Sequence, residues 1–274
     1  GFGPALIQTE EVTDLQLSSI FWVTIVLGLT LTILLIGIAP LIAIFYDNPN
    51  LEPLTTLFAF NFFIQGFAIV QRSLLKRKMN FKQLAIVQIS AALVGGVVAV
   101  IMAVYGFGVW SLVSRRLITS LGLVGTLWII SDWKPSFTFS WNSVKELLGF
   151  SGNLTGFKAF NYWVRKADDL LVGRFLGSQA LGLYTRAYQV MLFPLQRISR
   201  VVGKVMFPVL SKIQDDKGRS KRAYLRTISI IALVTFPLML GLLATTEHLV
   251  LAVLGSQWVG IIVLLRFLAL VGMV

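Results

Sequence analysis

Two neighbouring apolar segments carry arginine and lysine side chains at spacings that place them on single faces of helices. In segment 180–210, a turn of ~100° per residue gathers four cations on a face about 60° wide, with one glutamine beside them. These residues are Arg186, Arg197, Arg200 and Lys204, with Gln189. Paired guanidinium N–H groups fit the oxygens of phosphate and pyrophosphate. The chemistry that this face predicts is the holding of an anion.

The preceding segment, 143–176, carries a second polar stripe. Helical spacing aligns one lysine, one asparagine, one tyrosine, one arginine and one aspartate, and two further charged residues flank them. The stripe consists of Lys158, Asn161, Tyr162, Arg165 and Asp169, flanked by Lys166 and Asp168. We expect Arg165 and Asp169, four residues apart, to pair. Asp168 and Asp169 either neutralise Arg165 or take part in ion coupling, and we favour neutralisation.

Positive charge exceeds negative charge on these two stripes. A cation that faces lipid at the bilayer centre costs roughly 2.5–3.5 kcal/mol, so several cannot all do so. Lys204 and Arg200, nearer a membrane surface, can snorkel to it. The stripes still hold six cations against the two carboxylates Asp168 and Asp169. We therefore favour a water-filled cavity, lined by both stripes, that receives an anionic ligand. Structural ion pairs between helices are the alternative.

About eight apolar runs are expected to position the stripes. The chain has 274 residues, of which 56% are hydrophobic and only 13% charged, whereas soluble domains carry about 25% charged residues. No run sustains the alternation of a strand, so we predict an all-α, polytopic transmembrane helix bundle. The expected helical runs are 17–45, 51–70, 84–104, 109–130, 143–176, 180–210, 228–244 and 249–274.

The connections between these runs alternate in positive charge. The connections at 46–51, 105–108, 177–179 and 245–248 contain no Lys or Arg, whereas the three alternate ones contain five, two and six. The positive-inside rule places the charged connections in the cytoplasm. We also expect further helices on both sides of the chain, because the sequence starts and stops within apolar runs. The stretch 132–142 is then a cytoplasmic connection between an N-terminal helical lobe, 1–131, and a C-terminal helical side, 143–274.

Several function classes are excluded or disfavoured by what the sequence lacks. It contains no Cys and a single His, His248, so thiolate chemistry and a histidine metal cluster are excluded and no cofactor is expected. No phosphate-binding glycine loop or hydrolase motif is present. The expected external connections are too short to hold a catalytic site, so we predict that the chain is not an enzyme. The net charge is +12, but the basic residues lie between or within apolar runs. They do not form the solvated basic face that nucleic-acid binding needs.

Arg115 and Arg116 interrupt the run 109–130. Adjacent helical residues point about 100° apart, so the two cannot share one narrow stripe. A cavity role for one of them stays open.

The chain resembles the Wzx-type polysaccharide flippases of the multidrug/oligosaccharidyl-lipid/polysaccharide exporter superfamily. The segments that carry the resemblance are 1–8, 168–177, 180–184, 187–188, 194–196, 207–211 and 236–239. The resemblance implies an internal part of a two-lobe transporter of twelve to fourteen helices in a bacterial inner membrane. It implies as cargo an undecaprenyl-pyrophosphate-linked oligosaccharide, moved by alternating access, with membrane lipids, a polysaccharide polymerase and glycosyltransferases as partners. The pyrophosphate matches the cation excess found above.

Four alternatives stay open at this point. A lipid II flippase, or a flippase for another lipid-linked glycan, would share the anionic cargo. A cation-coupled multidrug exporter should have an acidic cavity rather than a basic one. A membrane glycosyltransferase should have a catalytic loop. A purely structural bundle would not need the cationic face.

Overall fold

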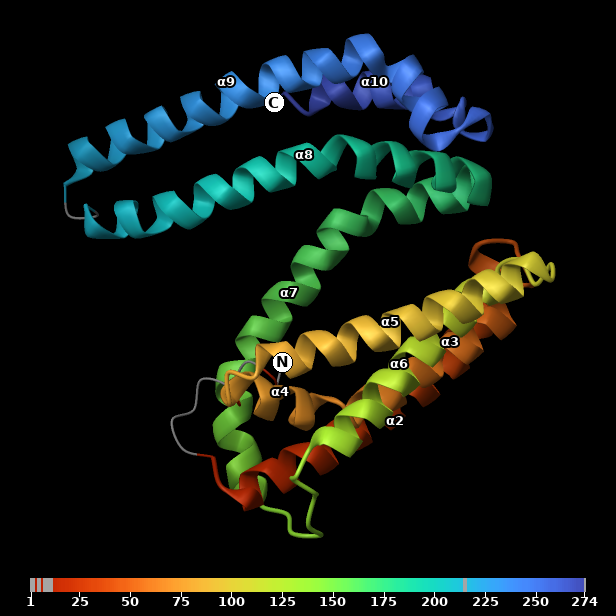
Figure 1. Ribbon diagram of the computed structural model, residues 1–274, viewed down its shortest axis with the longest axis vertical. Coiled ribbons are helices and arrows are strands. Elements are labelled where there is room, and N and C mark those ends of the chain that lie inside the picture. The colour runs from red at the N-terminus through yellow and green to blue at the C-terminus, as the bar shows by residue number, and fades with distance from the viewer. Residues whose placement is uncertain (1–2, 4–5, 7–11, 214–215, 274) are drawn as a thin grey trace. The chain divides into compact units, whose positions relative to one another are not determined.

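The computed structural model describes residues 3, 6, 12–213 and 216–273, and over these residues it contains helices and no strand (Figure 1). In chain order the helices are α2 (Asp14–Phe45), α3 (Leu51–Gly66), α4 (Ile69–Arg77), α5 (Phe81–Val104), α6 (Trp110–Ile130), α7 (Trp141–Phe175), α8 (Gly177–Lys212), α9 (Lys217–Leu249) and α10 (Ile261–Val271). Most helices begin and end close to the expected runs, but α9 begins eleven residues before the expected run 228–244 and so contains most of the basic residues that were expected in a connection. The predicted all-α class is confirmed.

The chain divides into two compact units, Gly1–Arg165 and Lys166–Val274, which are described separately. The first unit contains α2 to α6 and most of α7, and the second contains the end of α7 with α8, α9 and α10. The expected lobe boundary at 132–142 coincides with the non-helical connection that joins α6 to α7. Its assignment as a boundary between lobes stays a prediction.

Glycine allows α2 and α3 to approach closely in the first unit. A Cβ on Gly28 would lie 2.8 Å from the carbonyl oxygen of Phe62, and one on Gly66 would lie 2.9 Å from that of Thr24. Such contacts let helix backbones pack in a membrane, where apolar side chains gain nothing by leaving lipid. The packing of α2 against α3 therefore depends on the close approach of the two helix backbones.

The second expected run is two helices rather than one. α3 and α4 meet at a bend of 44°, and the bend frees backbone carbonyls that a continuous helix would use. The hydroxyl of Thr24 donates to Gly66 O over 3.2 Å, and the indole of Trp128 donates to Phe67 O over 3.1 Å. Such partners are what a broken helix needs at membrane depth. These two hydrogen bonds thus stabilise the bend.

The connection between α6 and α7 is fastened to the first turns of α2. The backbone N–H groups of Ser136 and Ser140 donate to the hydroxyls of Ser18 and Ser19, over 3.1 and 2.9 Å. Trp22 donates its indole N–H to Ser136 O over 2.9 Å.

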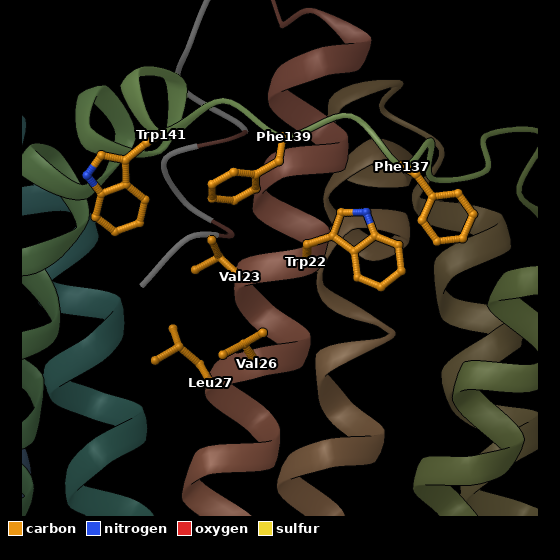
Figure 2. Close-up of a pocket in the computed structure, with 7 residues that line it drawn as sticks. All are labelled: Trp22, Val23, Val26, Leu27, Phe137, Phe139 and Trp141. Atoms are coloured by element: carbon orange, nitrogen blue, oxygen red, sulfur yellow. The ribbon is translucent and has the colours of Figure 1, made fainter.

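Beside this connection lies an apolar cavity of about 620 Å³. Figure 2 shows its walls: Trp22, Val23, Val26 and Leu27 come from α2, and Phe137, Phe139 and Trp141 come from the connection and the start of α7. The ring of Phe137 stacks on Trp22 with centroids 5.3 Å apart. Trp side chains of this kind are frequent at membrane–water interfaces.

The second unit corrects one expected connection. We placed a turn at 245–248, but α9 continues through it to Leu249, followed by a π-helical turn, Val250–Leu254. The reversal comes at Gly255, whose φ of +92° is a backbone conformation that suits glycine. The residues 250–260, like the expected connection at 245–248, contain no Lys or Arg.

Four helices are long and apolar enough to span a membrane over the part of the chain that the structure describes, and the bent pair α3–α4 makes a fifth. The four are Asp14–Phe45, Phe81–Val104, Trp110–Ile130 and Gly218–Leu254. α7 and α8, which carry the polar stripes, do not pass this test, although both exceed 30 residues. The chain is a multi-pass membrane protein whose two most polar long helices are those with the candidate site.

Candidate anion-binding faces

The cationic face of α8 is a consequence of its amphipathic pattern. α8 begins at Gly177, whose φ is +84°, and contains no Asp or Glu in its 36 residues. On one side, Ala187 and Met191 are buried in a core with residues of α9 and α10. The predicted residues Arg186, Gln189, Arg197 and Arg200 are exposed instead. The side chain of Lys204 lies outside the described residues.

Two of these arginines rest on aromatic rings. The Arg186 guanidinium lies 5.6 Å from the centre of the Trp258 ring and donates a hydrogen bond to Gln189 Oε1 over 3.4 Å. Arg197 lies 5.4 Å from the centre of the Phe193 ring. A ring face holds a guanidinium in place without cancelling its charge. These arginines are thus oriented but still positive.

The α7 stripe of the first unit is only partly organised. Arg165 donates from Nε to Asn161 Oδ1 over 3.2 Å, and Tyr162 is exposed. The side chain of Lys158 lies outside the described residues. The structure therefore brings together Asn161 and Arg165, and it leaves Tyr162 available on the same helix.

The expected pairing of Arg165 with Asp169 is wrong. Asp169 forms an ion pair with Lys166, and Asp168 accepts a hydrogen bond from Tyr184 over 2.7 Å. A lysine three residues away takes the same carboxylate, and Arg165 donates to Asn161 instead. Neither aspartate is used to neutralise Arg165.

The ion pairs seen between described residues do not involve the predicted ligands. They join Lys166 to Asp169 and Arg266 to Glu247, the latter over 3.4 Å. None of the predicted ligands Arg165, Arg186, Arg197 and Arg200 belongs to either pair. The cation excess predicted from the sequence is therefore present within these ranges. Its two stripes fall in different units, so the cavity lined by both stays a prediction.

A polar network in the first unit was missed from the sequence. Arg72 donates to Gln65, Gln65 donates to Ser120, and Ser120 donates to Asn61. The sequence pattern places Arg72 in the charged connection between the expected runs 51–70 and 84–104. The signal that could have identified the network is the pair Asn61 and Gln65, two amides one helical turn apart within an apolar run.

Arg115 and Arg116 point to different surroundings. Both are exposed. Arg115 lines an apolar groove of about 690 Å³ between α5 and α6, together with residues such as Gly96, Val100 and Leu112. Arg116 lies one turn from Ser120 and so belongs near the polar network. No group of metal-ligating residues occurs in the part of the chain that was described.

Comparison with known proteins supplies a family and relatives. The model of a family described as "Polysaccharide biosynthesis protein" matches residues 1–263. The chain is 31% identical to a teichuronic acid biosynthesis protein, TuaB, of Bacillus subtilis, over 99% of this chain and 57% of the relative. It is 28% identical to a lipopolysaccharide biosynthesis protein, WzxC, of Escherichia coli, over 100% of this chain and 56% of the relative.

A third relative is named for transport. The chain is 29% identical to a succinoglycan biosynthesis transport protein, ExoT, of Rhizobium meliloti, over 92% of this chain and 50% of the relative. The chain thus spans about half the length of the curated relatives it matches. No solved structure matches the chain.

Proposed function

Because this chain belongs to the polysaccharide biosynthesis protein family, we propose that it is part of a transporter for undecaprenyl-pyrophosphate-linked oligosaccharides. The transporter moves its cargo across the bacterial inner membrane by alternating access. It performs no covalent chemistry. Its partners are the lipid-linked glycan, the surrounding lipids, and the polymerase and glycosyltransferases of the same pathway. The relatives named for teichuronic acid, lipopolysaccharide and succinoglycan support a glycan cargo.

The observation that carries the proposal is the unneutralised cationic face of α8. Arg186, Arg197 and Arg200 are exposed on a helix without carboxylates, and two of them are held by aromatic rings. Exposed guanidinium groups on a membrane helix favour a ligand with paired anionic oxygens. In the proposal, Arg165, Arg186, Arg197, Arg200 and Lys204 hold the pyrophosphate. Lys158, Asn161, Tyr162 and Gln189 contact sugar or phosphate groups.

Alternating access would need the two lobes to rock about the bound headgroup, as the repeats of other transporters do. In this proposal residues 1–131 belong to one lobe, 143–274 to the other, and 132–142 to the connection between them. The polyprenyl tail stays in lipid. Asp168 and Asp169 are held by Tyr184 and Lys166, which favours a structural role for them over ion coupling.

The test is transport of a lipid-linked glycan by the intact protein in a strain that lacks its own transporter. Arg186→Ala and Arg197→Ala should each abolish glycan export while expression and membrane insertion persist. Lys221→Ala removes an exposed cation that lies on α9 rather than on α8 and is the matched control. Normal export by both α8 variants would contradict the proposal.

A further inference from the structure

The polar network of the first unit crosses the packed interior between α3, α4 and α6. Arg72 donates to Gln65 Oε1 over 3.3 Å, and Gln65 Nε2 donates to Ser120 Oγ over 2.9 Å. The Ser120 hydroxyl donates to Asn61 Oδ1 over 2.6 Å. Asn61 is 5% exposed and Ser120 is 2% exposed. The network is therefore enclosed by helices over most of its length.

α6 gives the depth of this network. It has 21 residues, Trp110–Ile130, with Ser120 at its middle. At about 1.5 Å per residue it is as long as the bilayer hydrocarbon is thick. Gln65 meets Ser120 at that middle level.

Arg72 lies beyond the bend, seven residues after Gln65, yet its guanidinium points back to the Gln65 amide. Snorkelling would take this side chain the other way, toward the charged end of α4 at 76–78. The hydrogen bond to Gln65 therefore directs the positive charge of Arg72 toward the middle of α6.

The network has spare donors rather than spare acceptors. Each of its three side-chain oxygens on Gln65, Ser120 and Asn61 already accepts a hydrogen bond. Arg72 Nε is buried without an acceptor, and an arginine offers five N–H donors and no acceptor. The neighbouring Gln71 is fully buried, and both its amide nitrogen and its amide oxygen are without a partner. Among the four residues of the network, the buried polar atom that lacks a partner is therefore a donor, Arg72 Nε.

Arg116 adds a second positive charge at the same place. It precedes Ser120 by one helical turn, so both residues lie on the same face of α6, and Ser120 is linked through Gln65 to Arg72. Neither arginine forms an ion pair with a carboxylate among the residues described. A guanidinium held toward the packed helices with no carboxylate beside it favours a counter-charge from a ligand.

We propose that Arg72 and Arg116 form an oxyanion site in the first unit, distinct from the α8 face, that binds a phosphate or pyrophosphate group. Gln65 and Ser120 are positioning residues, because they hold the Arg72 guanidinium toward the middle of α6. Identifying the anion with the headgroup of the transported lipid rests on the proposed function. A free phosphate anion would fit the same chemistry, so the experiment distinguishes the two sources.

The experiment is titration calorimetry of the intact protein in detergent with inorganic pyrophosphate as the probe. The background carries Arg186→Ala and Arg197→Ala, so that the α8 face contributes little. Arg72→Gln and Arg116→Gln should each lower the affinity at least about tenfold, because each removes a charge-assisted pair of donors. Arg72→Lys should keep most of the affinity. Lys78→Gln removes an exposed cation at the end of α4 and should leave the affinity unchanged.

An unchanged affinity in Arg72→Gln would overturn the site. So would a variant that unfolds at lower temperature but binds pyrophosphate as before, because that result assigns the network a structural role only. Circular dichroism and size-exclusion chromatography on each variant check that it is folded. These readouts measure binding and not export, so a failure here is separate from a failure of the proposed function.

A second titration identifies the source of the anion. Farnesyl pyrophosphate carries the same headgroup on a short isoprenoid tail. Binding that is tighter than for inorganic pyrophosphate, and equally dependent on Arg72, assigns the site to the lipid headgroup. Equal affinities for the two probes would support the oxyanion site but would assign it to a free anion rather than to the transported lipid. Absence of Arg72-dependent binding with both probes would overturn it.

Discussion

Tyr184 near the start of α8 donates its hydroxyl to Asp168 Oδ2 near the end of α7, over 2.7 Å. The other carboxylate oxygen, Asp168 Oδ1, is buried without a partner. The two helices are joined by a short reversal at Gly177. This hydrogen bond therefore links α7 to α8 and provides a partner for one of the two oxygens of the carboxylate.

Tyr184→Phe should destabilise the second unit, because it leaves both oxygens of Asp168 without a donor. Loss of one partner from a buried polar group costs about 1–3 kcal/mol. Thermal unfolding of the purified protein measures the effect. Asp168→Asn in the Tyr184→Phe background removes the unpaired charge and should recover part of the loss. If Tyr184→Phe matched the unchanged protein in stability, the bond would be irrelevant to the hairpin.

Gly28→Ala should weaken the packing of α2 on α3. The added Cβ would lie 2.8 Å from the carbonyl oxygen of Phe62, and the backbones must move apart to admit it. Gly37→Ala is the matched control on the same helix, because nothing lies within 4 Å of its Cβ position. Replacing a helical glycine by alanine in open space stabilises by about 0.5–1 kcal/mol. Opposite shifts of the unfolding temperature are expected, and shifts of the same sign would contradict the close approach.

The helices were largely predictable, because long apolar runs and turn residues set them. α5 and α6 begin and end within three residues of the expected runs. The error at 245–248 arose because Thr245, Thr246, Glu247 and His248 are polar enough to suggest a turn. Thr246 instead donates its hydroxyl to Leu242 O within the helix. The hydroxyl therefore has a hydrogen-bond partner without ending α9.

The candidate site was predictable in composition but not in pairing. Helical spacing identified the exposed cations of α8, since exposure follows from the amphipathic pattern. It did not identify the partners, because Trp258 and Tyr184 reach Arg186 and Asp168 from residues far along the chain or across a turn. Arg72 was misplaced for a related reason. Counting it as a loop charge ignored the bend between α3 and α4, which lets it reach back to Gln65.

Trp22→Phe should loosen the connection between α6 and α7 without unfolding the first unit. It keeps a ring for stacking on Phe137 but loses the hydrogen bond to Ser136 O, which is worth about 0.5–1.5 kcal/mol. Faster chymotrypsin cleavage after Phe137 or Phe139 is the expected readout. Phe160→Leu, at an exposed position of α7, is the control for removing an aromatic ring. Equal cleavage rates in the unchanged protein and Trp22→Phe would show that the serine contacts suffice.

Trp258→Leu should weaken handling of the cargo by releasing Arg186 rather than by removing it. The guanidinium lies 5.6 Å from the Trp258 ring centre, and such a contact is worth about 0.5–2 kcal/mol. Under the proposed function, the concentration of lipid-linked glycan that gives half-maximal transport should rise by about 2- to 30-fold, with little change in the maximal rate. Trp258→Phe keeps a ring face and should restore most of the affinity. A fall in maximal rate at unchanged half-maximal concentration, in a folded Trp258→Leu protein, would mean that the ring does not position Arg186 for binding.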